Sequence, residues 1–135
     1  MHAEAMYTKT THAVEVTVEP QFLADQSKPE ASRWFWSYTI TIQNHGAQSV
    51  QLMSRHWRIT DASGRVNEVK GPGVVGEQPT LAPGDSFSYT SGCPLPTPSG
   101  IMVGTYHFRD QAGEAFEVDI PAFSLDSPSV GRVIN

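Results

Sequence analysis

Three glycines with the spacing of a phosphate-binding loop are the strongest chemical signal in the sequence. Gly71, Gly73 and Gly76 form the pattern G-x-G-x-x-G. In a dinucleotide-binding fold this pattern follows a strand and begins a helix, whose N-terminal amides bind the pyrophosphate. Here the next segment, 77–85, contains two prolines and a further glycine, and such a segment does not continue a helix. The motif therefore occurs without the helix that would make it a nucleotide site.

Two interpretations of this glycine segment remain open. Successive amides in a glycine-rich turn can form an anion-binding concavity without a helix. Lys70 would support an anion there, whereas Glu77 would repel it, and no G-K-[ST] sequence follows. The other interpretation is a long connection between two sheets, in which glycines permit positive φ and prolines stiffen the crossing. We expect this architectural role and keep a pyrophosphate-like ligand as the alternative.

Two histidines are the candidates for a metal site. Alternation along strands turns His56 and His107 away from their apolar neighbours. Together with a carboxylate from residues 117–119 they could form a transition-metal site on one outer sheet face. No H-x-x-x-H or C-x-x-C spacing occurs, and Arg58 and Arg109 lie beside the histidines. We therefore expect solvated cross-strand pairs, with no bound metal and no cofactor.

The sequence offers no catalytic group with a visible activating partner. Cys93 is followed by Pro94 and has no base nearby in the sequence, although a nucleophilic thiolate needs a partner that lowers its pKa. The run 54–56, Ser-Arg-His, lacks the G-x-S-x-G elbow of a hydrolase. We expect Cys93 to be a buried thiol and the protein not to be an enzyme.

Composition bounds the class of protein. The 135 residues fit one domain. A net charge of −5 with nine scattered basic residues argues against nucleic acid as a partner. The single cysteine excludes an internal disulfide and fits a reducing compartment. The sequence contains no signal peptide and no apolar run long enough to cross a membrane, so we expect a cytoplasmic protein with no membrane partner.

The elements that would carry these residues are short strands. Apolar residues alternate with polar ones in seven segments, and a change of parity predicts a bulge near Ser54. This pattern predicts an all-β, fibronectin type III-like antiparallel sandwich of three plus four strands. The strands that contain Trp57, 65–70, Tyr106 and Val118 would form the larger sheet. The predicted core comprises Val14, Val16, Val18, Trp36, Tyr38, Ile40, Ile42, Trp57, Ile59, Phe87, Tyr89, Tyr106, Phe108, Phe116, Val118 and Ile120.

Several uncommon runs occur in one order from about residue 8 to residue 125. They are Ser54-Arg55-His56-Trp57, Gly71-Pro72-Gly73-Val74-Val75-Gly76-Glu77-Gln78-Pro79, Leu81-Ala82-Pro83-Gly84, Tyr89-Thr90-Ser91-Gly92-Cys93-Pro94-Leu95, Gly104-Thr105-Tyr106 and Ile120-Pro121-Ala122-Phe123-Ser124-Leu125. In these runs the chain resembles the bacterial ApaG family. The resemblance implies a fibronectin type III-like fold and an association with cobalt tolerance and magnesium efflux. Related domains in F-box proteins and a DNA polymerase δ-interacting protein imply protein–protein contact, and the family implies no catalytic residues.

Exposed apolar material favours a role in protein interaction. Trp34, Phe35, Met53, Val74 and Val75 have no evident place in the core and are the candidates for an interaction surface. The alternative is that loops bury them at the ends of the sandwich. We expect a flexible tail at 1–10, an ApaG domain at 11–125, a flexible tail at 126–135, and an unknown protein partner. Binding of a small anion or a divalent metal is the alternative function.

Overall fold

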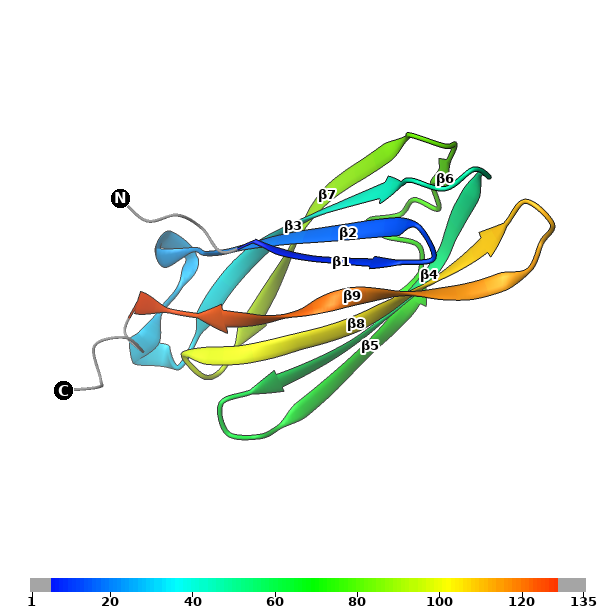
Figure 1. The fold of residues 1–135 in the computed structure, drawn as a ribbon. Coiled ribbons are helices and arrows are strands. Elements are labelled where there is room, and N and C mark those ends of the chain that lie inside the picture. The colour runs from blue at the N-terminus through cyan, green and yellow to red at the C-terminus, as the bar shows by residue number, and fades with distance from the viewer. Residues whose placement is uncertain (1–5, 129–135) are drawn as a thin grey trace.

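Two antiparallel sheets packed face to face make up the protein, as the computed structural model shows for residues 6–128 (Figure 1). The first sheet has the strand order β1-β2-β3-β7. The second has the order β5-β4-β8-β9, and β6 pairs with β4. The strands are β1 (Tyr7–Thr11), β2 (Val14–Phe22), β3 (Trp34–Asn44), β4 (Val50–Asp61), β5 (Val66–Pro72), β6 (Thr80–Leu81), β7 (Ser86–Leu95), β8 (Ser99–Asp110) and β9 (Ala115–Asp126). The predicted all-β, fibronectin type III-like antiparallel sandwich is confirmed.

The strand count differs from the prediction. The described residues form four plus five strands instead of three plus four, because β1 and β6 were not predicted. β1 pairs with β2 from Tyr7↔Val18 to Thr11↔Val14, so the predicted flexible tail at 1–10 is wrong for residues 7–10. β9 likewise includes Asp126, the first residue of the predicted C-terminal tail. Residues 1–5 and 129–135 lie outside the described part of the chain.

The core lies between the two sheets and follows the alternation of the strands. β3 buries every second residue from Trp36 to Asn44, as the pleat of a strand requires. The predicted core side chains are buried except Ile59, Phe87 and Phe116, which are partly buried and pack against the others. Two short 3₁₀ turns (Ala24–Gln26 and Pro29–Ala31) connect β2 to β3. No helix in residues 6–128 is long and apolar enough to span a membrane.

A bulge in β4 brings both halves of that strand onto the core. The register between β4 and β8 shifts between Leu52 and Ser54, as predicted. Leu52 and Trp57 are five residues apart, an odd spacing that would place them on opposite faces of a regular strand. Both are nevertheless buried, because the extra residue of a bulge changes the parity of the strand.

The two long sides of the sandwich are closed differently. On one side β1 and β9 are tied together: Lys9 Nζ lies 3.1 Å from Asp119 Oδ2, and the Tyr7 and Ser124 hydroxyls are 3.2 Å apart. The Asp119 amide also donates to Thr11 Oγ1. The opposite side is bounded by the edge strands β7 and β5, which belong to different sheets. A cleft opens between them.

Candidate functional site

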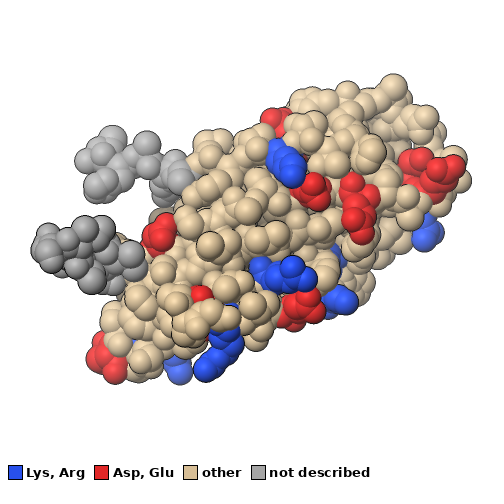
Figure 2. Space-filling view, turned by 60° about the horizontal axis from the view of Figure 1, so that its bottom comes forward, with Lys and Arg blue, Asp and Glu red and all other residues tan. Residues whose placement is uncertain are grey.

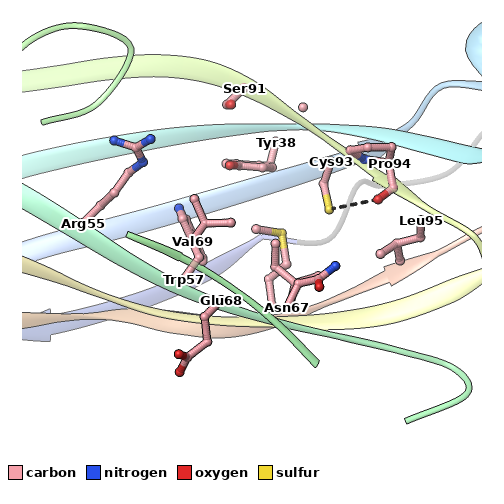
Figure 3. A pocket seen from close by; sticks show the side chains of 13 residues that line it. Tyr38, Arg55, Trp57, Asn67, Glu68, Val69, Ser91, Cys93, Pro94 and Leu95 are labelled. Carbon is pink, nitrogen blue, oxygen red and sulfur yellow. Dashed lines mark hydrogen bonds between the residues drawn. The ribbon is translucent and has the colours of Figure 1, made fainter. Parts of the chain in front are cut away.

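The cleft between β5 and β7 has a volume of about 390 Å³ (Figure 3). Its rims are the two edge strands, and its floor is formed by side chains of β3, β4 and β8. The lining residues are Tyr38, Arg55, Trp57, Ile59, Asn67, Glu68, Val69, Ser91, Gly92, Cys93, Pro94, Leu95 and Met102. This volume lies within the range of binding pockets, which is roughly 300–1,000 Å³.

The two ends of the cleft differ in chemistry. Arg55 lies at one end near Tyr38 and Ser91, whereas Cys93 and Leu95 lie toward the other (Figure 3). Burial raises the pKa of Tyr38, and a hydrogen bond with Ser91 opposes that rise, so the phenol is neutral at physiological pH. The cleft therefore offers a charged, hydrogen-bonding end and an end at which apolar side chains lie beside Asn67.

Arg55 is held in place by the glycine segment. Its Nη1 donates to the carbonyl oxygens of Pro72 at 3.1 Å and Gly73 at 2.8 Å. A Cβ on Gly71 would lie 3.1 Å from the same guanidinium nitrogen, so the glycine leaves room for the arginine. This positions a cation at the end of the cleft through two charge-assisted hydrogen bonds.

Cys93 forms part of the apolar end and is nearly inaccessible. The side chain is 4% exposed, and its Sγ lies 3.9 Å from the Pro94 carbonyl oxygen. Burial raises the pKa of the thiol to about 11. A group with this pKa is protonated at neutral pH, which makes it a poor nucleophile.

A pair of tyrosines joins the two sheets. The hydroxyls of Tyr89 in β7 and Tyr106 in β8 form a short hydrogen bond. Burial raises the pKa of both phenols, so they stay neutral and each satisfies the other's buried hydroxyl. This bond fixes β7, one rim of the cleft, against the second sheet.

The glycine segment 71–76 ends β5 and continues into a hairpin turn at 74–77, so it does not start a helix. Val74 N donates to Glu77 O at 2.9 Å and Glu77 N to Val74 O at 2.8 Å. Val75 and Gly76 both have positive φ, 43° and 82°, which defines a type I′ turn. Gly73 also has positive φ, and a Cβ there would lie 2.1 Å from Glu77 O. Three amides that an anion could use, those of Gly73, Val74 and Glu77, thus donate to backbone carbonyls.

The two candidate histidines lie on the outer face of the second sheet, each beside a different glutamate. His56 Nε2 is 3.4 Å from a carboxylate oxygen of Glu68 in β5, and His107 Nδ1 is 3.5 Å from one of Glu117 in β9. Both histidines border one hollow together with Lys70. Within residues 6–128 no group of three or more His, Cys, Asp or Glu side chains could hold a metal ion.

The five residues expected at an interaction surface do not share one environment. Val74 is buried in the core, so its assignment to a surface is wrong, whereas Val75 is 56% exposed at the tip of the turn. Trp34 is partly buried against the core, and its Nε1 has no hydrogen-bond partner among the described residues. Phe35 covers Gly92 on the outer face of β7, where a Cβ would lie 2.8 Å from the ring. Met53 is partly buried beside the bulge.

Sequence reasoning did not identify the cleft. Three of its polar residues, Tyr38, Arg55 and Ser91, come from three strands that are distant in the sequence. One signal was available: the segment 86–95, which forms β7, contains no charged residue. On the face shown in Figure 2, basic and acidic side chains are interspersed, and Lys and Arg do not gather into one patch.

Comparisons with known proteins identify the family. The family model of the ApaG domain matches residues 24–110. The chain is 61% identical over 130 residues to Protein ApaG of Brucella anthropi, covering 96% of this chain and 100% of that protein. It is 62% identical over 123 residues to Protein ApaG of Rhodospirillum centenum, covering 91% and 95%. A crystal structure of a Bordetella pertussis protein named ApaA is similar, with a TM-score of 0.82, 49% identity and coverage of 90% and 96%. The chain therefore belongs to the ApaG domain family.

Proposed function

We propose that this protein is a non-catalytic, cytoplasmic protein-interaction module whose docking site is the cleft between β5 and β7. The observation that carries the proposal is the combination of apolar side chains toward one end of the cleft with an arginine at the other end. Protein interfaces commonly join a desolvated apolar centre to a few placed polar groups, with aromatic residues and arginine enriched. On this proposal, the partner accounts for the association with cobalt tolerance and magnesium efflux that the family resemblance implies.

Amide NMR with two kinds of titrant tests this function. A protein partner is first captured on the immobilised chain, identified by mass spectrometry and purified. Titrated into the isotope-labelled chain, it should shift amides around the cleft, whereas magnesium-ATP, pyrophosphate and cobalt should leave the spectrum unchanged at millimolar concentration. Saturable shifts at 70–77 with the anions, or at His56 and His107 with cobalt, and none with a protein, would contradict the proposal.

A further inference from the structure

The hydrogen bonds of β3 show which backbone groups of β7 point away from β3. Asn44 N donates to Asp85 O at 2.9 Å, at the end of the β3–β7 ladder. Phe35, an odd-numbered residue, bonds instead on the β2 side, since its carbonyl accepts from Leu23 N and its amide donates to Ser27 Oγ. Because hydrogen-bonded pairs alternate in antiparallel sheets, even-numbered residues of β3 bond the odd-numbered residues of β7. The even-numbered residues of β7 therefore direct their backbone groups outward.

These outward groups form an edge that carries no charged residue. Ser88, Thr90 and Gly92 present both N–H and C=O, and Pro94 presents C=O alone. No strand within residues 6–128 pairs with this edge. Natural proteins commonly protect such edges with charged residues or short strands. β7 has ten residues and no charge in its sequence, Ser-Phe-Ser-Tyr-Thr-Ser-Gly-Cys-Pro-Leu.

The other sheet edges of the described chain are protected. Two hydrogen bonds show which residues of β5 bond β4: Asp61 N donates to Arg65 O, and Gly73 N donates to Met53 O. The outward positions of β5 are consequently even-numbered and include Glu68, Lys70 and Pro72, which block strand addition by charge or by the missing amide. β1 and β9 are tied to each other across the sandwich, as described above. β7 carries one such block, Pro94 near its C-terminal end, and it differs from the other three edges because Ser88, Thr90 and Gly92 keep their outward amides and it bears no charge.

The cleft beside β7 lies where one more strand of the first sheet would run. β5 pairs with β4, yet its Val69, which shares the cleft-facing side with Trp57, remains 40% exposed. An additional strand on β7 would extend the first sheet over this part of β5 and cover Val69. Its backbone would bond the outward groups of β7, and alternate side chains would enter the cleft.

We propose that an extended segment of a partner protein adds antiparallel to β7 along residues 88–94; this inference rests on the proposed function. One cleft-facing side chain of the segment is apolar and packs against Cys93, Leu95 and Met102. The next cleft-facing side chain, two residues toward the C-terminus, is Asp or Glu and pairs with Arg55. Antiparallel pairing sets this order, because β7 runs from the arginine end of the cleft toward Leu95 (Figure 3).

A second copy of the chain fits this edge poorly. Antiparallel pairing of β7 with β7 of another molecule would join the first sheets of the two molecules into one continuous sheet. The second sheets of both molecules would then lie on the same face of that sheet. Each second sheet ends in β5, which forms the opposite rim of the cleft beside β7. The two β5 strands would then overlap, because the space between them would be only about 4.8 Å, the width of one strand. A single peptide strand avoids this overlap.

Selection from a library of displayed twelve-residue random peptides on the full chain tests the proposal. Selected peptides should carry an apolar residue followed two positions later by Asp or Glu. In the complex, hydrogen exchange at the amides of Ser88, Thr90 and Gly92 should slow, and intermolecular NOEs should show antiparallel pairing with β7. These readouts use the unaltered protein and do not depend on any variant folding.

A proline variant tests the backbone contact. Thr90→Pro removes an outward amide without breaking the ladder to β3, and it should weaken peptide binding at least about fivefold, the effect of one hydrogen bond. Thr90→Ala is the matched control, because it keeps the amide, and it should bind within about twofold of wild type. Peptides that bind with unaltered affinity to Thr90→Pro, or that shift another face, would overturn strand addition while leaving an interaction function intact. If no peptide and no protein binds, both proposals fail, and dimerisation through β7 in sedimentation experiments would replace the partner segment with a second copy.

Discussion

Cys93 should react slowly with thiol reagents in the folded protein. A thiol with an ordinary pKa of about 8.5 is about one-quarter thiolate at pH 8. With the pKa raised by burial to about 11, only about one molecule in a thousand is thiolate at that pH, roughly 200-fold less. The more basic thiolate is intrinsically about tenfold more nucleophilic, given a Brønsted coefficient of about 0.4–0.5. Ionisation alone therefore slows the reaction about twentyfold, and the low exposure of the Cys93 side chain slows it further.

Intact-protein mass spectrometry during alkylation with iodoacetamide measures this rate. The chain has a single cysteine, so each adduct reports on Cys93, and Cys93→Ser should give none. The native rate at pH 8 should be at least about twentyfold below the rate in concentrated urea and should rise about tenfold per pH unit up to pH 10. A native rate within about threefold of the unfolded rate, or a plateau near pH 9, would refute the reasoning.

Three further predictions concern stability. Gly104→Ala would place a Cβ 2.7 Å from the Trp57 ring, and this overpacking should lower the free energy of unfolding by about 1–3 kcal/mol in urea titrations, whereas exposed Val103→Ala should have little effect. Val75→Asn should raise the free energy of unfolding by about 1 kcal/mol, because a β-branched residue is strained at positive φ and Asn-Gly suits a type I′ turn; Val75→Ala should gain less if this explanation holds. The hydrogen bond from Ser63 lowers the pKa of Asp61, so the stabilisation from this carboxylate should be present above about pH 4 and disappear as pH falls through the lower folded pKa. Thermal melts should show the gap between wild type and Asp61→Asn closing in acid, and a gap that widens there would contradict the assignment.

The parts of the fold that could be predicted are those in which burial imposes a pattern. Strands β2, β3 and β8 have one face in the core, so their apolar residues alternate and their sheets could be predicted. β1 could not, because it is an edge strand whose sequence, Tyr-Thr-Lys-Thr-Thr, is mostly exposed. β6 has two residues, too few for any periodicity. Long-range pairing creates both of these strands, and local sequence carries little signal for such pairing.

The glycine segment shows where motif reasoning and structure agree. The two prolines and the glycine after the motif argued against a helix, and the chain forms a hairpin at 74–77 instead. The close approach of Gly73 to Glu77 O could not be predicted, because it depends on how the hairpin folds back. The role of the segment in holding Arg55 likewise arises from a contact between β4 and residues 72–73.

The cleft itself could be predicted only in part. The absence of charge in segment 86–95 is visible in the sequence, but its meaning depends on whether that strand lies in the middle or at the edge of a sheet. A central strand without charged residues is ordinary in a sandwich, because both of its edges are already paired. An edge strand without charged residues can pair with a strand of another molecule. Topology decides between the two, and topology follows from pairings such as Trp36↔Cys93 that link residues far apart in the sequence.

Amide hydrogen exchange of the free protein tests the open edge of β7 most directly. The amides of Ser88, Thr90 and Gly92 should exchange quickly, and those of Phe87, Tyr89, Ser91 and Cys93, which bond β3, should exchange slowly. This alternation would support an edge available to a partner strand. Uniformly slow exchange along β7 would contradict it, because the outward amides would then already be bonded in solution.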